Sequence, residues 1–449
     1  MRPSVCAWLL VAACGRIDFA PLPDAGAPPV TNGRRLHAVE AESDHGSLFL
    51  GWYDPELGTE CTFRTAEDGA TRCLPPTDYG VLFADAGCTA PLAELVGPWA
   101  NAACARPPYA TRLATNTVYR MGMASTQTTT YAGNPTNCLV VMPAITPPTF
   151  LFEVGEVIPA SAFVAATEAL VPLGRLSAVE LIGDDDSHQR TGEMFDTVRN
   201  ERCRWLANGI DTAYCVGNSV TVSPPGFSDA ACTQPAVRAS APGSFVLIVD
   251  ASACPTSQRM VATGPALGAF YRNQGNTCVV DAGTAYSIVD VPPDGPVRAS
   301  LVFDRNAGAG VLASWHTDEL DVPASLFDTK RNSACTPFVD HASKRYVCAP
   351  PTTTAYGVYS DAACTQLTFE FTSPCNDANH AFSNYPQPPS GSAEICEGAG
   401  MDLQVFDTPL PTPRYEDNGI GCVQITGWGI LNPTPLDGTQ LPRLRRVIR

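Results

Sequence analysis

Apolar residues occur in short runs that are rich in β-branched and aromatic side chains and end at Gly, Pro or Asp. Clear examples are residues 79–83, 219–222, 244–249, 286–291 and 298–303. Runs of this length and composition predict β-strands. Only residues 160–170, between two prolines, are compatible with a short helix. The pattern therefore predicts an all-β fold.

One phrase occurs three times, at residues 83–89, 227–233 and 359–365. An aromatic residue, an Asp, a Cys and a Thr keep the same register in each copy. An earlier phrase, an aromatic residue followed by Asp and then by two cysteines, also recurs three times. These repeats predict three tandem units of similar length, at 33–173, 174–309 and 310–449.

A second aromatic-to-Cys segment lies in the latter half of each unit, at residues 131–138, 271–278 and 415–422. The three segments match one another, and each resembles a diverged copy of the segment in the first half of its unit. Six half-repeats of short strands favour a six-bladed β-propeller, in which radial repetition protects the sheet edges. The alternative is three tandem β domains stapled by disulfides.

The chain has 18 cysteines and no Cys-x-x-Cys pair. Such usage indicates cystines in an exported protein rather than a metal site. Cysteines 12 or 13 residues apart are candidates to close hairpins, whereas those 11 to 22 apart are candidates to join the two halves of a unit. The hairpin pairs are Cys61/Cys73, Cys203/Cys215 and Cys335/Cys348, and the half-joining pairs are Cys88/Cys104, Cys232/Cys254 and Cys364/Cys375. Spacing alone leaves the connectivity open.

The N-terminal segment, 1–32, has the features of an export signal followed by a tether. A basic residue precedes a short apolar stretch and the sequence Val-Ala-Ala-Cys, so residues 1–13 predict a signal peptide. Cys14 is the candidate for lipidation, with ordinary secretion as the alternative. Residues 14–32, rich in Pro, Ala and Gly, predict a flexible tether to a repeat domain at 33–449.

The net charge of −17 argues against a nucleic-acid partner, because the phosphate backbone attracts basic surfaces. The sequence contains no Gly-x-Ser-x-Gly elbow, zinc-protease helix motif or phosphate-binding loop. We therefore expect no cofactor and no catalytic residue of these kinds.

Each unit carries an acidic stretch with a His. In a propeller these stretches would emerge on one face, where they could bind Ca²⁺ or a basic or sugar ligand; the alternative is solvated hairpin loops. The candidate residues are Asp44, His45, Asp184, Asp185, Asp186, His188, His316, Asp318 and Glu319. The repeated Asp54, Asp196 and Asp328, with Arg199 and Arg331, and the repeated Asp85, Asp229 and Asp361 are expected to stabilise turns.

The lipobox-like start, the Cys-Gly-Arg-Ile-Asp-Phe sequence from Cys14 and the Asp-Ala-Ala-Cys-Thr-Gln repeats resemble uncharacterised Cys-rich repeat lipoproteins of Gram-negative bacteria. This resemblance covers essentially the whole chain. Because Gly and not Asp follows Cys14, it implies sorting to the outer membrane, but it implies no activity.

The expected function is that of an outer-membrane or surface-exposed lipoprotein with a non-enzymatic binding or adhesion role. The membrane is a partner through the lipid anchor, and a protein or a carbohydrate is the expected ligand. One alternative is a secreted polysaccharide hydrolase or lyase, and the other is a purely structural envelope component.

Overall fold

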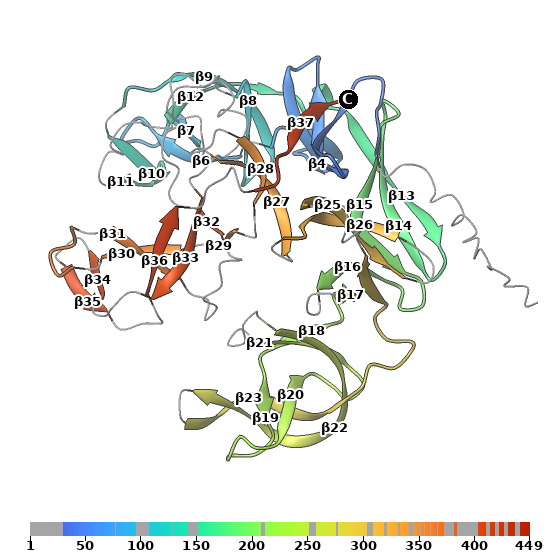
Figure 1. Cartoon of the computed structure of the whole chain (residues 1–449). Coiled ribbons are helices and arrows are strands. Elements are labelled where there is room, and N and C mark those ends of the chain that lie inside the picture. The colour runs from blue at the N-terminus through green and yellow to red at the C-terminus, as the bar shows by residue number, and fades with distance from the viewer. Residues whose placement is uncertain are drawn as a thin grey trace, which may run out of the picture.

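The fold is taken from a computed structural model of the chain (Figure 1). It describes residues 30–449 except 77, 96–106, 128, 142–150, 208–211, 251–256, 275–276, 303–308, 318–320, 331–332, 341–344, 350–351, 354, 360, 366, 372–380, 384–402, 410–413, 418–421, 426–429 and 436–440. The predicted signal peptide, Cys14 and all but the last three residues of the predicted tether lie outside the described residues. The fold is all-β, as the apolar pattern predicted.

One sheet of 16 strands takes strands from all three units, and we call it the ring sheet. Each ring segment begins with the strand that ends the preceding unit of the sequence, so β13, β24 and β37 are counted from here on with units two, three and one. Unit one then contributes β1 (Val30–Thr31), β2 (His37–Ser43), β3 (Gly46–Asp54), β4 (Thr59–Thr65), β5 (Thr71–Leu74) and the closing strand β37 (Arg445–Ile448). Unit two contributes β13 (Ala165–Leu173), β14 (Leu176–Gly183), β15 (His188–Asp196), β16 (Glu201–Ala207) and β17 (Thr212–Gly217). Unit three contributes β24 (Arg298–Val302), β25 (Ala309–His316), β26 (Asp321–Asp328), β27 (Ser333–Asp340) and β28 (Arg345–Ala349).

The units join at three seams. β5 pairs with β13 at seam 1–2, and β17 pairs with β24 at seam 2–3. At seam 3–1, β28 contacts residues 442–444, and the same segment continues as β37, which pairs with β2. The sheet therefore closes on itself through hydrogen bonds and leaves no free edge along this path.

The three seams use the same hydrogen bond. The backbone N–H of Cys73 donates to Val164 O at 2.9 Å, and that of Cys215 donates to Val297 O at 2.8 Å. At seam 3–1, Cys348 donates to Pro442 O at 2.9 Å. This recurrence at corresponding positions shows that the three units are arranged with approximate threefold symmetry.

Between the ring strands, each unit inserts a smaller sheet, and we call these three insertions the satellite sheets. Satellite 1 holds β6 (Asp78–Phe83), β7 (Pro91–Leu95), β8 (Tyr109–Arg112), β9 (Thr117–Ala124), β10 (Thr130–Asn134), β11 (Asn137–Val141) and β12 (Leu151–Ile158). Satellite 2 holds β18 (Thr221–Ser223), β19 (Gly226–Phe227), β20 (Pro235–Ala239), β21 (Phe245–Asp250), β22 (Ser257–Gln274) and β23 (Thr277–Val289). Satellite 3 holds β29 (Thr352–Thr353), β30 (Ala355–Tyr359), β31 (Leu367–Phe371), β32 (Ala381–Ser383), β33 (Leu403–Pro409), β34 (Arg414–Asp417), β35 (Cys422–Ile425) and β36 (Ile430–Pro435). Figure 1 shows the satellites at three separate places beside the ring sheet.

This topology corrects both detailed expectations for the fold. The described strands form one ring sheet and three satellite sheets instead of the six separate sheets of a six-bladed propeller. The units are not three independent domains in a row either, because their first halves share one sheet. Each repeat unit is therefore one ring segment plus one satellite.

Two kinds of disulfide recur in every unit. Cys61–Cys73, Cys203–Cys215 and Cys335–Cys348 join neighbouring ring strands, as the spacing of these cysteines predicted. The proposed pairing of the other set is wrong for Cys88, Cys232 and Cys364. The observed bonds are Cys88–Cys138, Cys232–Cys278 and Cys364–Cys422. The proposed partners Cys104, Cys254 and Cys375 lie outside the described residues.

The second aromatic-to-Cys segment is the partner strand of the first. Phe83 is opposite Tyr131, with Cys88 bonded to Cys138. The pairs Phe227 and Tyr271, and Tyr359 and Tyr415, occupy the same place in satellites 2 and 3. The two segments of a unit are therefore paired strands of one satellite sheet and not corresponding strands of two blades.

Residues 160–170, expected as a possible helix, contain a single 3₁₀ turn, Ala160–Ala162, and then enter β13. The β-branched and alternating residues of this segment pair with β14 along its length. Tertiary pairing therefore overrides the local helical compatibility.

The recurring Asp at the end of β3, β15 and β26 is buried, with only 1% of Asp54, Asp196 and Asp328 exposed. Asp54 accepts two hydrogen bonds from the turn after β3, and its other contacts are to the guanidinium of Arg35 at 2.7 Å. Asp196 forms the same pair with Arg175, also at 2.7 Å. These two carboxylates are structural, as expected, although their Arg partners are not the Arg199 that the sequence suggested. Arg331, suggested for unit three, lies outside the described residues.

Candidate functional site

The acidic turn of unit two lies between β14 and β15 and docks on the start of unit one. Asp185 is 7% exposed, and its carboxylate accepts hydrogen bonds from the backbone N–H groups of Arg35 at 3.1 Å and Leu36 at 2.7 Å. Gly33 is required beside it, since a Cβ there would collide with the carboxylate. Burial alone would raise the pKa of Asp185, but hydrogen bonds from Ser187, Leu36 and Arg35 outweigh it and lower the pKa. This carboxylate is therefore a structural cap.

The neighbours of Asp185 also contact unit one. Asp186 pairs with Arg34 at 3.0 Å on the surface, where both side chains are about three-quarters exposed. The carbonyl of Asp184 accepts from the same guanidinium at 3.1 Å. His188 is opposite Thr31 in the pairing of β15 with β1.

The corresponding turns of units one and three lie at the other seams. Ser43, next to the exposed Asp44 and His45, donates from its hydroxyl to the carbonyl of Gly310 at 2.6 Å. In unit three, His316 ends β25 at seam 2–3, while Asp318 and Glu319 lie outside the described residues.

The described turn residues are thus distributed over three seams and do not converge on one site. Within the described part of the chain, no group of three or more His, Cys, Asp or Glu side chains could hold a metal ion. The described turns therefore serve mainly to join one ring segment to another.

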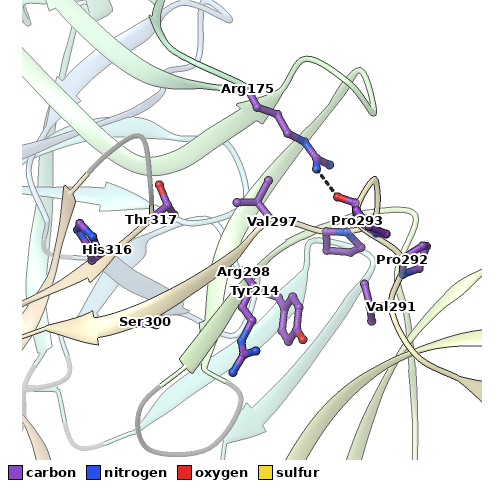
Figure 2. A pocket seen from close by; sticks show the side chains of 11 residues that line it. Arg175, Tyr214, Val291, Pro292, Pro293, Val297, Arg298, Ser300, His316 and Thr317 are labelled. Carbon is purple, nitrogen blue, oxygen red and sulfur yellow. Dashed lines mark hydrogen bonds between the residues drawn. The ribbon is translucent and has the colours of Figure 1, made fainter.

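An open cleft of about 650 Å³ lies at seam 2–3, and His316 is the one residue of its lining that the sequence had named as a candidate. Figure 2 shows that its walls come from unit two, the segment leaving satellite 2, and unit three. It is lined by Arg175, Tyr214, Val291, Pro292, Pro293, Pro296, Val297, Arg298, Ser300, His316 and Thr317. Proteins commonly bind small ligands in clefts of this size that combine apolar walls with a few polar groups.

Arg175 holds the wall that leaves satellite 2. Its guanidinium binds Asp196 and donates to the carbonyls of Pro293 at 3.3 Å and Gly295 at 2.7 Å (Figure 2). Arg35 performs the corresponding task in unit one, where it donates to Ala162 O at 2.9 Å. Arg175 is therefore a positioning residue that fixes the rim of the cleft.

Tyr214 and Arg298 supply an aromatic ring and an exposed guanidinium to the cleft. They are directly opposite each other in the pairing of β17 with β24. Figure 2 shows their side chains side by side and pointing the same way. Arg298 is exposed and takes part in no ion pair within the described residues. This guanidinium is available to an external ligand.

The same position differs at the other two seams. At seam 1–2 the corresponding pair is Arg72 and Ala165, and Arg72 is held by Asp68 at 2.8 Å and by the carbonyl of Phe163. At seam 3–1 the pair is Val347 and Arg443. The combination of an aromatic residue with an exposed Arg therefore belongs to seam 2–3.

Sequence reasoning missed Tyr214, Arg298 and the structural role of Arg175. Tyr214 and Arg298 are brought together by strand pairing across satellite 2, and no local motif signals such pairing. The role of Arg35 and Arg175 had a sequence signal, because each lies between the glycine and the leucine that begin its unit.

Comparison with family models matches residues 9–293, more than half of the chain, to a family of unknown function, DUF7481. Comparisons with curated proteins and with solved structures find no match.

Proposed function

The chain belongs to the family of unknown function DUF7481, and we propose that it is an exported lipoprotein of the outer membrane that binds a carbohydrate ligand without chemical turnover. The seam 2–3 cleft is the proposed binding site. Its combination of a Tyr, an exposed Arg and three prolines in about 650 Å³ is the observation that carries the binding role.

The disulfides indicate an oxidising compartment outside the cytoplasm, because reducing thiol systems keep cytosolic cysteines in the thiol form. In the described part of the chain, no helix is long and apolar enough to cross a membrane. Attachment through a lipidated Cys14 is the proposed route to the membrane, supported by the Val-Ala-Ala-Cys sequence at residues 11–14.

The closed ring suits a binding role because it holds the cleft walls in place. The walls come from different units and are fixed by Arg175 and the Cys203–Cys215 bond. A preformed site loses less conformational entropy on binding than a mobile one. These features support recognition and do not depend on a nucleophile or a metal.

Labelling cells with radioactive palmitate tests the anchor. We expect the wild-type protein to be labelled and to fractionate with the outer membrane, whereas Cys14→Ala is unlabelled. Cys6→Ala provides the matched control, because Cys6 precedes the predicted cleavage point. Equal labelling of wild type and Cys14→Ala would contradict lipidation at this residue.

A glycan array probed with fluorescently labelled protein tests the cleft. Ser300 is an exposed residue of the cleft lining, so Ser300→Trp should abolish binding by filling the cleft. Val302→Trp, on the same exposed face of β24 but outside the cleft lining, should bind as wild type does. The cleft proposal fails if no glycan binds, or if Ser300→Trp binds normally. Shortened or unsaturated products from the bound glycans would favour the hydrolase or lyase alternative.

A further inference from the structure

We propose that the seam 2–3 cleft recognises acidic sugars through a carboxylate, that is, the uronic-acid class of carbohydrate. This inference rests on the proposed carbohydrate-binding function and adds the chemistry of the ligand. Arg298 is assigned to the carboxylate, and Tyr214 with the prolines is assigned to the sugar ring.

The charge of the cleft differs from that of the chain. The whole sequence has 45 Asp and Glu against 28 Lys and Arg. The cleft lining, by contrast, contains Arg175, Arg298 and His316 and no carboxylate. Because the lining supplies positive charge and no carboxylate, it favours an anionic group over a cationic one.

Arg298 has the geometry for carboxylate recognition. Its guanidinium is exposed and forms no ion pair with the described residues, so binding does not require an existing pair to break. A planar guanidinium matches both oxygens of a carboxylate through two parallel hydrogen bonds. Arg175 could not do this, since its donors already serve Asp196 and the carbonyls of the rim.

The other walls suit a sugar ring. Tyr214 presents an apolar ring with a hydroxyl at its tip, and Pro292, Pro293 and Pro296 present flat apolar surfaces. Ser300 lies directly opposite His316 across β24 and β25, which brings two further hydrogen-bonding side chains to the same cleft. Apolar faces beside several hydrogen-bonding groups match the alternating faces and hydroxyls of a sugar.

The comparison of the seams identifies this chemistry as local to one site. Ala165 replaces Arg298 at seam 1–2, where Arg72 is already engaged by Asp68. At seam 3–1, Arg443 occupies the position of Arg298 and is exposed, but the residue opposite it is Val347 and not an aromatic residue. Carboxylates also lie beside that seam, where Arg449 pairs with Glu40 at 2.8 Å and with Glu42. Among the described residues, the seam 2–3 surface therefore differs from the other seams in placing an exposed guanidinium beside an aromatic ring, in a cleft whose lining holds no carboxylate.

Isothermal titration calorimetry of the full chain with tetragalacturonic acid tests the proposal. Its methyl ester and neutral galactotetraose keep the sugar size but lack the charge, and a sulfated tetrasaccharide carries a different anion. We expect tetragalacturonic acid to bind most tightly and its affinity to fall as salt is added. Arg298→Gln should weaken it roughly tenfold, as for loss of one bidentate charged contact.

Arg120→Gln is the matched control, because Arg120 is an exposed arginine of satellite 1 paired with Glu156 at 2.9 Å. It should bind as wild type does. Equal affinity for the acid and its methyl ester, tighter binding of the sulfated sugar, or unchanged binding by Arg298→Gln would each overturn the uronate assignment. If neutral glycans bind on the array and Ser300→Trp abolishes that binding, the proposed carbohydrate-binding function stands without the uronate assignment. If no glycan binding is lost in Ser300→Trp, both the proposed function and the uronate assignment are wrong.

Discussion

At the scale of single residues, the thrice-repeated Asp of the phrase around residue 85 closes a turn through its ionised carboxylate. Asp85 accepts from the backbone N–H of Ala90 at 2.7 Å and from the hydroxyl of Thr89 at 2.7 Å. Asp229 repeats these contacts with Gln234 and Thr233. The turn also places Cys88 at φ 50°, the left-handed region, from which it reaches Cys138. The repeated phrase therefore positions its cysteine to form a disulfide.

This turn predicts an acid-dependent loss of stability. Hydrogen bonds from Ala90 and Thr89 lower the pKa of Asp85 to about 2, against about 3.9 for an unfolded Asp. Because the pKa of Asp85 is lower in the folded than in the unfolded state, its carboxylate stabilises the fold at a pH above the unfolded pKa. This contribution disappears as the pH falls through the folded-state pKa. Asp85→Asn should therefore be less stable than wild type at neutral pH, with the difference vanishing towards pH 2.

Urea unfolding of both proteins across this range measures the difference. The gap between their midpoints should stay constant from about pH 6 to about pH 4 and then narrow. Glu156→Gln, at an exposed ion pair, serves as a control whose midpoint should differ little from wild type. A gap for Asp85→Asn that stays the same down to about pH 2 would show that its charge does not stabilise the turn.

At the scale of elements, the apolar pattern predicted most strands well and their pairing poorly. The run at 79–83 became β6 (Asp78–Phe83), and the run at 244–249 became β21 (Phe245–Asp250). β10, however, pairs with β6 although β7, β8 and β9 lie between them in the chain. The similarity of the two aromatic-to-Cys segments predicts two separate blades, whereas the structure pairs the segments within one sheet, because similarity between two segments does not show whether they pair with each other.

Peptide mapping under non-reducing conditions checks the revised disulfide. Trypsin should release residues 73–112, which hold Cys73, Cys88 and Cys104, and residues 121–175, which hold Cys138. Cys73 is bonded to Cys61, so Cys88 and Cys104 are the cysteines of the first peptide that can link it to the second. We expect these peptides to remain linked in wild type and in Cys104→Ser, and to separate in Cys88→Ser. Unlinked peptides in wild type would instead support a bond between Cys88 and Cys104, because these two cysteines share one peptide.

In the chain-entropy view, closing the loop between Cys88 and Cys138 stabilises the fold by about 4 kcal/mol. The double variant Cys88→Ser with Cys138→Ser should therefore unfold at a much lower urea concentration than wild type.

At the scale of the whole molecule, the ring explains why the site escaped prediction. The cleft forms where β17, β24 and β25 meet, so its residues come from two units and from the segment leaving satellite 2. Repetition in the sequence identified the units, but the position of one unit against the next depends on hydrogen bonds such as Cys215 to Val297.

A closed ring also predicts that its three segments lose stability together. Leu444, 2% exposed, packs with Ala41, Leu326 and the Cys335–Cys348 pair at seam 3–1. Leu444→Ala removes that packing and should cost about 2–5 kcal/mol. Because units one and two share the ring sheet, hydrogen exchange should become faster in β14 and β15 of unit two as well as beside the mutation. Leu139→Ala, at a position 63% exposed in satellite 1, should leave exchange unchanged. If Leu444→Ala speeds exchange only in units one and three, the three units unfold independently and the ring does not couple them.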